Sequence, residues 1–161
     1  MSQFATIQTT IKDGKLLVQC LKEMGYSVEE GHNLKLHGYL GDTRPQTADI
    51  VIRRKHLGSA SNDIGFRKVG DAYQLIISDY DRGAGDGRAI QTDLVDKVVR
   101  MEREIREEMI RIEREIQNAV MRKYADQKVR KTIEELKKQG FTLRRRTEKG
   151  KQVVYECVRL T

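Results

Sequence analysis

The sequence has few of the residues that mark secreted, fibrous or membrane proteins. It contains two cysteines, one proline and no tryptophan in 161 residues. Cys20 and Cys157 each lie in a run typical of a buried element, so we expect two reduced thiols rather than a disulfide. No segment approaches the roughly 20 apolar residues that span a bilayer, and residues 1–7 lack the pattern of a signal peptide. We therefore expect a cytoplasmic protein with no membrane partner.

The composition is that of a chain that folds. Apolar residues make up 38% of the sequence and are spread along it, while charged residues make up 34%. A chain of this length has the usual size of one domain and can bury one core without disulfides or metals. We predict a single α+β domain over residues 1–161.

The net charge of +7 comes from the C-terminal segment. Residues 1–90 contain 12 basic residues (Lys and Arg) and 11 acidic residues (Asp and Glu), and residues 91–120 contain 6 basic and 8 acidic residues. Residues 121–161 contain 13 basic and 5 acidic residues. Such a basic segment favours an acidic partner, a class that includes nucleic acids, acidic proteins and anionic membranes.

Short apolar runs and glycines predict the elements of the first half. Residues 4–11 alternate and are rich in β-branched side chains, which indicates a strand. Apolar residues over 16–24 recur at helical spacing, and Gly25 is placed to end that helix before a strand over 26–28. This is one helix-glycine-strand unit.

The next segments predict an antiparallel meander. Glycine and polar residues over 31–46 indicate a loop with one short strand. Three runs with strand composition follow, the last two joined across Gly70-Asp71. They are residues 48–53, 63–67 and 72–77.

A long charged helix is predicted over residues 90–120, after a glycine-rich and aspartate-rich segment, 78–88, that we expect to be a flexible loop. Its apolar residues recur at steps of three and four, typical of a narrow apolar stripe. We assign protein interaction to six of them. They are Val98, Met101, Ile105, Met109, Ile112 and Ile116.

The stripe is too long for so small a sheet to cover. It therefore either packs on a partner helix or projects in part. A coiled coil with a second copy stays open, although Glu108 stands where a strict heptad from Met101 needs an apolar residue. Both homo-oligomerisation and binding of another protein fit this pattern.

The C-terminal segment predicts a second helix-glycine-strand unit. Apolar residues over 129–136 have helical spacing and are followed by Gly140. Strands over 141–144 and 153–158, joined around Lys149-Gly150, then form a hairpin. The fold class we predict is α+β, with an antiparallel sheet, two helix-strand units, a long charged amphipathic helix and a C-terminal β-hairpin.

No pattern of catalytic or metal-binding residues is present. The Gly83-Ala84-Gly85-Asp86-Gly87 run resembles a phosphate loop, but Arg88 stands where a dinucleotide fingerprint needs glycine. Ile90 replaces the closing glutamate of a calcium loop. The three histidines have no spacing typical of zinc ligands. We predict no catalytic residue, no cofactor, no metal site and a protein that is not an enzyme. A weaker alternative is an enzyme with an unfamiliar active site around residues 38–43 and Asp63.

A basic cluster at the C-terminal hairpin is the remaining candidate site. If Arg144 and Arg146 share a strand face, they could straddle phosphates and bind in a salt-sensitive way. Otherwise the charges protect a solvated edge hairpin from aggregation. The cluster consists of Lys137, Lys138, Arg144, Arg145, Arg146, Lys149 and Lys151.

The order of several short segments is similar to that in an uncharacterised family. The segments are residues 2–7, Gly25-Tyr26, Gly38-Tyr39-Leu40-Gly41, Ala48-Asp49-Ile50-Val51-Ile52, Asp63-Ile64-Gly65-Phe66, Tyr73, Tyr124-Ala125, Lys128-Val129 and Gln139-Gly140-Phe141. With them the chain resembles the hypothetical chloroplast frame thirty-five family, also called domain of unknown function twelve-fifty-seven. It departs from that family between Asp79 and Val120.

The resemblance implies a fold more than a function, because the family has no established activity to carry over. Its members resemble accessory proteins encoded beside a AAA+ ATPase. We therefore expect a non-enzymatic accessory or adaptor protein that binds another protein, with a AAA+ ATPase as the implied partner. The alternative is a nucleic-acid (RNA) binding module that uses the basic hairpin.

Overall fold

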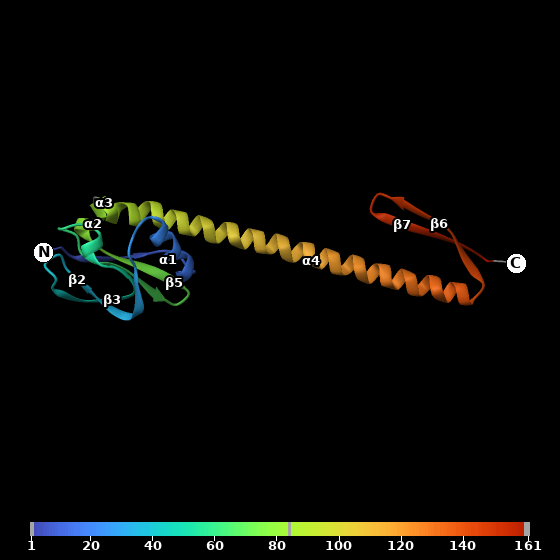
Figure 1. Cartoon of the computed structure of the whole chain (residues 1–161), viewed down its shortest axis with the longest axis horizontal. Coiled ribbons are helices and arrows are strands. Elements are labelled where there is room, and N and C mark those ends of the chain that lie inside the picture. The colour runs from blue at the N-terminus through green and yellow to red at the C-terminus, as the bar shows by residue number, and fades with distance from the viewer. Residues whose placement is uncertain (1, 84, 160–161) are drawn as a thin grey trace. The chain divides into compact units, whose positions relative to one another are not determined.

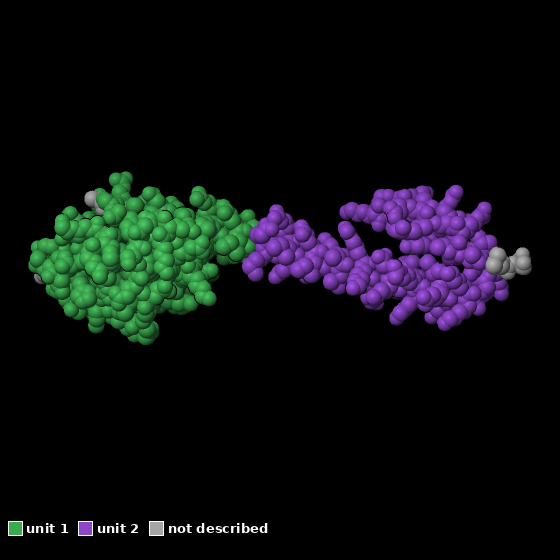
Figure 2. Space-filling model, in the orientation of Figure 1, with its two compact units in different colours: residues 1–107 green, residues 108–161 purple. Residues whose placement is uncertain are grey.

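The computed structural model describes residues 2–83 and 85–159, and the chain divides into two compact units (Figures 1 and 2). Unit 1 comprises residues 1–107 and unit 2 comprises residues 108–161. That residues 1–161 fold as one domain stays a prediction.

Unit 1 is built on a five-stranded antiparallel sheet with the order β1-β5-β4-β3-β2. The predicted meander is confirmed as β3, β4 and β5, with Gly70 in the turn between the last two at a φ of +65°. The strands are β1 Phe4–Gln8, β2 Glu29–His37, β3 Thr43–Ile52, β4 Ile64–Val69 and β5 Ala72–Ser78, and a short 3₁₀ helix spans Arg54–His56.

Helix α1, Gly14–Glu23, has the start and the end that its sequence predicts. The Asp13 carboxylate accepts hydrogen bonds from the backbone N–H groups of Lys15 and Leu16, at 2.9 and 3.1 Å, and so caps the helix. At the other end Gly25 has a φ of +91°, and Tyr26 N–H donates to the Leu21 carbonyl at 3.0 Å. This is a glycine C-cap of the Schellman type. The following strand begins at Glu29 rather than at residue 26.

The core of unit 1 lies between the sheet, α1 and the first turns of the long helix α4, Val95–Lys138. Fully buried side chains from all three elements meet there, among them Leu17, Leu21, Phe66, Leu75 and Val98. A smaller cluster of Leu36, Ala48, Val51 and Ile76 lies on the other face of the sheet. Together they give unit 1 two apolar layers.

The predicted loop over residues 31–46 is wrong for most of its length. Strand β2 runs to His37 and β3 starts at Thr43, leaving only a short turn between them. The pairing of β2 with β3 shifts register between Glu30 and Leu34 and again between Lys35 and His37. These bulges break the two-residue alternation by which a strand is recognised in a sequence.

The flexible loop predicted over residues 78–88 is also wrong, because helices α2, Asp79–Gly83, and α3, Gly85–Ala89, occupy it. Residue 84 lies outside the described residues. The Asp81 N–H donates to Ser78 Oγ at 3.1 Å, which fixes the start of α2. A Cβ at Gly87 would lie 2.2 Å from the Asp81 carbonyl oxygen. This glycine therefore serves close packing rather than flexibility.

From Gly85 to Lys138 the chain is helical throughout: α3 leads through a π-helical turn, Ile90–Leu94, into α4, Val95–Lys138. The segments predicted over 90–120 and 129–136 thus form one helix. Thr92 lies inside it and donates to the Arg88 carbonyl. None of the described helices is long and apolar enough to cross a membrane.

Unit 2 combines the remainder of α4 with an antiparallel hairpin of β6, Phe141–Lys149, and β7, Gln152–Arg159. Gly140 after the helix and Gly150 in the turn have positive φ, +90° and +59°, as their predicted positions require. The predicted hairpin and the α+β class are therefore confirmed. Among residues 108–159 no side chain is fully buried.

Candidate interaction surfaces

The first two residues of the predicted interaction stripe belong to unit 1. Val98 is fully buried and Met101 packs against the core. Nearby, the Glu102 carboxylate accepts hydrogen bonds from the backbone N–H groups of Lys12 and Asp13, at 2.8 and 2.6 Å. These bonds hold this part of α4 against the residues that precede α1. Ile105 is 48% exposed.

The rest of the stripe is exposed in unit 2. Met109, Ile112 and Ile116 are between 46% and 58% exposed, and Val120, which the sequence reading did not include, is 60% exposed. At 3.6 residues per turn these four side chains lie on one face of α4, and we call them the α4 stripe. Contiguous exposed apolar side chains of this size are typical of interaction sites.

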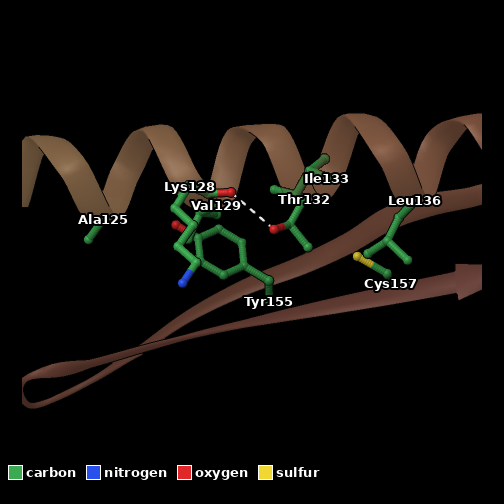
Figure 3. Close-up of a pocket in the computed structure, with 8 residues that line it drawn as sticks. All are labelled: Ala125, Lys128, Val129, Thr132, Ile133, Leu136, Tyr155 and Cys157. Atoms are coloured by element: carbon green, nitrogen blue, oxygen red, sulfur yellow. Dashed lines mark hydrogen bonds between the residues drawn. The ribbon is translucent and has the colours of Figure 1, made fainter.

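An apolar groove lies on another face of α4 in unit 2, between the helix and the hairpin. Figure 3 shows the Tyr155 ring below the helix beside Lys128 and Thr132, and Cys157 below Leu136. The groove has a volume of about 420 Å³. Its lining consists of Ala125, Lys128, Val129, Thr132, Ile133, Leu136, Tyr155 and Cys157.

Sequence reasoning missed this groove. Helical spacing over residues 129–136 gave the wall contributed by α4. Tyr155 and Cys157 form the opposite wall. The sequence pattern does not predict which face of the hairpin packs on the helix, and so it does not predict this wall.

The basic cluster lies in the last turn of α4 and along the hairpin. Lys137 and Lys138 end the helix, where cations interact favourably with the unpaired carbonyls. Lys149 and Lys151 flank the turn at Gly150. These side chains are exposed, as is the run of three arginines on β6.

The three arginines do not form one face. A register shift between Leu143 and Arg145 places Arg145 opposite Glu156 and Arg146 opposite Tyr155. Arg144 also approaches Glu156, at 3.9 Å, so it lies away from the face that Arg146 shares with Tyr155. The arrangement in which Arg144 and Arg146 straddle phosphates from one face is therefore not present.

All of the net charge lies in unit 2. Residues 108–161 carry 15 Lys and Arg against 8 Asp and Glu, whereas residues 1–107 carry 16 of each. A partner attracted by charge is therefore drawn to unit 2.

The proposed alternative site around Asp63 is a buried hydrogen-bond network in unit 1. Asp63 is 1% exposed, and its carboxylate accepts from Arg54 N–H at 2.8 Å, His37 N–H at 2.9 Å and the Arg53 guanidinium at 2.8 Å. Arg53 also donates to Glu29 at 2.5 Å, and this hydrogen bond lowers the pKa of the Glu29 carboxyl. Both carboxylate oxygens of Asp63 are thus engaged in holding strands β2 and β3 to the segment after them.

The turn at residues 38–41 is held by the same region. Tyr39 N–H donates to Asn62 Oδ1 at 3.0 Å, and the Tyr39 carbonyl accepts from the Arg54 guanidinium. Leu40 at the tip is 73% exposed. In the described ranges no group of three or more His, Cys, Asp or Glu side chains could hold a metal ion.

The sequence that forms both units matches a known protein family. Residues 20–155 match the sequence model of a family described as a protein of unknown function (DUF1257). The chain belongs to this family. The DUF1257 match includes the sheet from β2 onward, all of α4 and most of the hairpin, so the predicted family is confirmed. No match was found among curated proteins or solved structures.

The DUF1257 range also runs through residues 79–120, where the sequence reading expected a departure from relatives. The α4 stripe and the wall that α4 gives to the groove therefore lie within the family range, and Cys157 of the groove lies beyond it. The description of the family names no activity and no binding partner.

Proposed function

We propose that this DUF1257 protein is a non-enzymatic accessory protein that binds another protein through the α4 stripe. The observation that carries the proposal is the set of four large apolar side chains, each between 46% and 60% exposed, on one face of α4. Leaving them in water forgoes the free energy that burial of apolar surface contributes, about 25 cal/mol per Å². A partner that covers them gains that free energy.

The charges beside the stripe fit a protein partner with a helical surface. Between Glu108 and Ile116 the helix carries two arginines and three glutamates, so this part of α4 is nearly neutral. A helix face with apolar residues at three- and four-residue steps is a common recognition element for a groove or for another helix. The family resemblance makes a AAA+ ATPase the first candidate partner, and a second copy of the chain is the next.

The test is a pair of double variants with matched chemistry. Met109→Glu with Ile112→Glu places two charges on the stripe, and Met121→Glu with Ile110→Glu places them on exposed residues outside it. We expect the stripe variant to lose at least about tenfold in affinity for the partner, as truncations at the centre of interfaces do, and the control to keep it.

The measurement combines capture of a AAA+ ATPase encoded beside a family member with light scattering of the protein alone. Loss in the stripe variant of either the captured ATPase or a dimer supports the proposal. If both double variants keep every partner and every assembly of the wild type, the proposal is wrong.

RNA binding by the basic hairpin is the second candidate function, because all of the net charge lies in unit 2. Replacement of Arg144, Arg145 and Arg146 by glutamate is compared with the same change at Arg111, Arg114 and Arg122. A hairpin site loses salt-sensitive RNA affinity only in the first variant. Equal losses indicate unspecific attraction, and no RNA binding by the wild type at low salt removes this candidate.

A further inference from the structure

We infer that the groove between α4 and the hairpin is a second binding surface, which receives an acidic amphipathic helix of a partner protein. Four of its eight lining residues are aliphatic, and the others are one lysine, one threonine, one tyrosine and one cysteine (Figure 3). The helical wall from Ala125 to Leu136 extends about 17 Å, which matches about three turns of a second helix.

The chain covers this apolar surface only in part. Val129, Ile133, Leu136, Tyr155 and Cys157 are half-buried. A two-stranded hairpin is at best marginally stable alone, and the β7 side chains that face α4, Tyr155 and Cys157, are only half-buried (Figure 3). An apolar ligand that fills the groove would bury these side chains and hold the hairpin against α4.

The charges around the groove select an acidic occupant. Residues 121–159 carry 13 Lys and Arg against 5 Asp and Glu, and Lys128 lines the groove itself. On the hairpin, Glu148 is already paired with Arg146 at 2.8 Å, and Glu156 approaches Arg144 at 3.9 Å. The remaining positive charge complements a helix with acidic flanks.

Two other occupants fit less well. The α4 stripe of a second copy carries charges of both signs and so offers no complement to this rim. A nucleic acid would satisfy the charges, but its phosphates would leave the aliphatic wall of Val129, Ile133 and Leu136 uncovered. An amphipathic acidic segment meets both the apolar wall and the basic rim.

This surface is distinct from the one in the proposed function. At 3.6 residues per turn, the α4 residues that line the groove centre on the side of the helix roughly opposite to the centre of the α4 stripe. Substitutions on one face therefore leave the other intact, and the two surfaces can be tested separately.

The probe is a labelled synthetic peptide of about 15 residues, long enough to form a helix, with leucines at helical spacing and glutamates elsewhere. Two matched peptides are used beside it: one with the same composition in scrambled order, and one with lysine in place of glutamate. We expect the acidic amphipathic peptide to bind the full chain at least about tenfold more tightly than either, with hydrogen-exchange protection of residues 125–136.

Variants of the full chain locate the site. Ile133→Asp should weaken binding by at least about tenfold and Lys128→Glu by about threefold. The controls Ile110→Asp and Lys123→Glu carry the same changes at exposed residues of α4 that line neither the groove nor the α4 stripe, and they should bind as the wild type does. Circular dichroism confirms that each variant keeps its helix.

The inference is wrong if the acidic peptide does not bind at concentrations on the order of 100 μM, or if the scrambled peptide binds equally well. It is also wrong if Ile133→Asp leaves peptide binding unchanged, or if the wild type forms a dimer that Ile133→Asp dissociates. An RNA that protects residues 125–136 where the peptide does not would assign the groove to nucleic acid instead.

Discussion

Units 1 and 2 differ in buried apolar side chains and in net charge. Every fully buried hydrophobic side chain of the described residues lies between Ile11 and Val98, and residues 1–107 have equal numbers of acidic and basic groups. Unit 2 has no fully buried side chain among its described residues and carries all of the net charge. The difference indicates that unit 1 holds its own fold, whereas unit 2 leaves apolar side chains exposed, which in the proposed function a partner covers.

The largest expected effect comes from truncating the same residue type in each unit. Leu75 is fully buried in the sheet, so Leu75→Ala should lower the free energy of unfolding by about 2–5 kcal/mol. Leu136 is half-buried in the groove, and Leu136→Ala should change the main transition by less than about 1 kcal/mol. Urea denaturation followed by circular dichroism measures both, and equal losses would show that unit 2 shares the core's stability.

Removing one partner of an ion pair should also destabilise unit 1, where the pair is buried, more than unit 2, where the pair is exposed. Asp63→Asn replaces one accepting oxygen by an NH₂ group, so buried N–H donors of unit 1 lose an acceptor, and should destabilise unit 1 by about 3 kcal/mol. Glu148→Gln removes the exposed partner of Arg146 in unit 2 and should have no measurable effect. A similar shift in thermal midpoint for both variants would contradict this part of the comparison.

The two glycine C-caps provide a smaller, closely matched test. Gly25 and Gly140 have φ angles of +91° and +90°, so alanine is strained equally at either position. Gly25→Ala should lower the stability of unit 1 by about 1 kcal/mol, and Gly140→Ala should leave the main unfolding transition in place. The comparison fails if Gly140→Ala shifts that transition as far as Gly25→Ala does.

The smallest effect is a pH dependence confined to unit 1. Burial, and then the hydrogen bond that the hydroxyl donates to Asp86 at 3.1 Å, raises the pKa of Tyr26 to about 12 from an ordinary value of 10.0. Because the folded state holds this proton more tightly, the contribution is complete below pH 10 and is lost as the pH rises towards 12. Tyr26→Phe should remove this part of the alkaline loss of stability, and an unchanged pH profile would show that Tyr26 does not contribute to it.

Local chemistry made part of this structure predictable. Gly25, Gly140 and Gly150 stand where the backbone needs a positive φ, and such positions are visible as glycines between periodic segments. The family could also be recognised, because the order of short segments survives in the sequence.

The errors arose where tertiary contacts override local composition. The bulges of β2 break its alternation, and Gly87 occurs in α3 because it approaches the Asp81 backbone. The apolar stripe was predicted as one surface, yet Val98 lies in the core and Ile116 is exposed. Sequence spacing identifies which residues share a face of a helix, but only tertiary packing determines which of those residues are buried and which are exposed.

Hydrogen exchange of the full chain without a partner tests the central claim most directly. The amides of β3, β4 and β5 should exchange only when unit 1 unfolds, and those of β6 and β7 should be at least about a hundredfold less protected because local opening exposes them. Slow exchange in the hairpin, equal to that in the sheet, would show that unit 2 is stable by itself and would contradict the account.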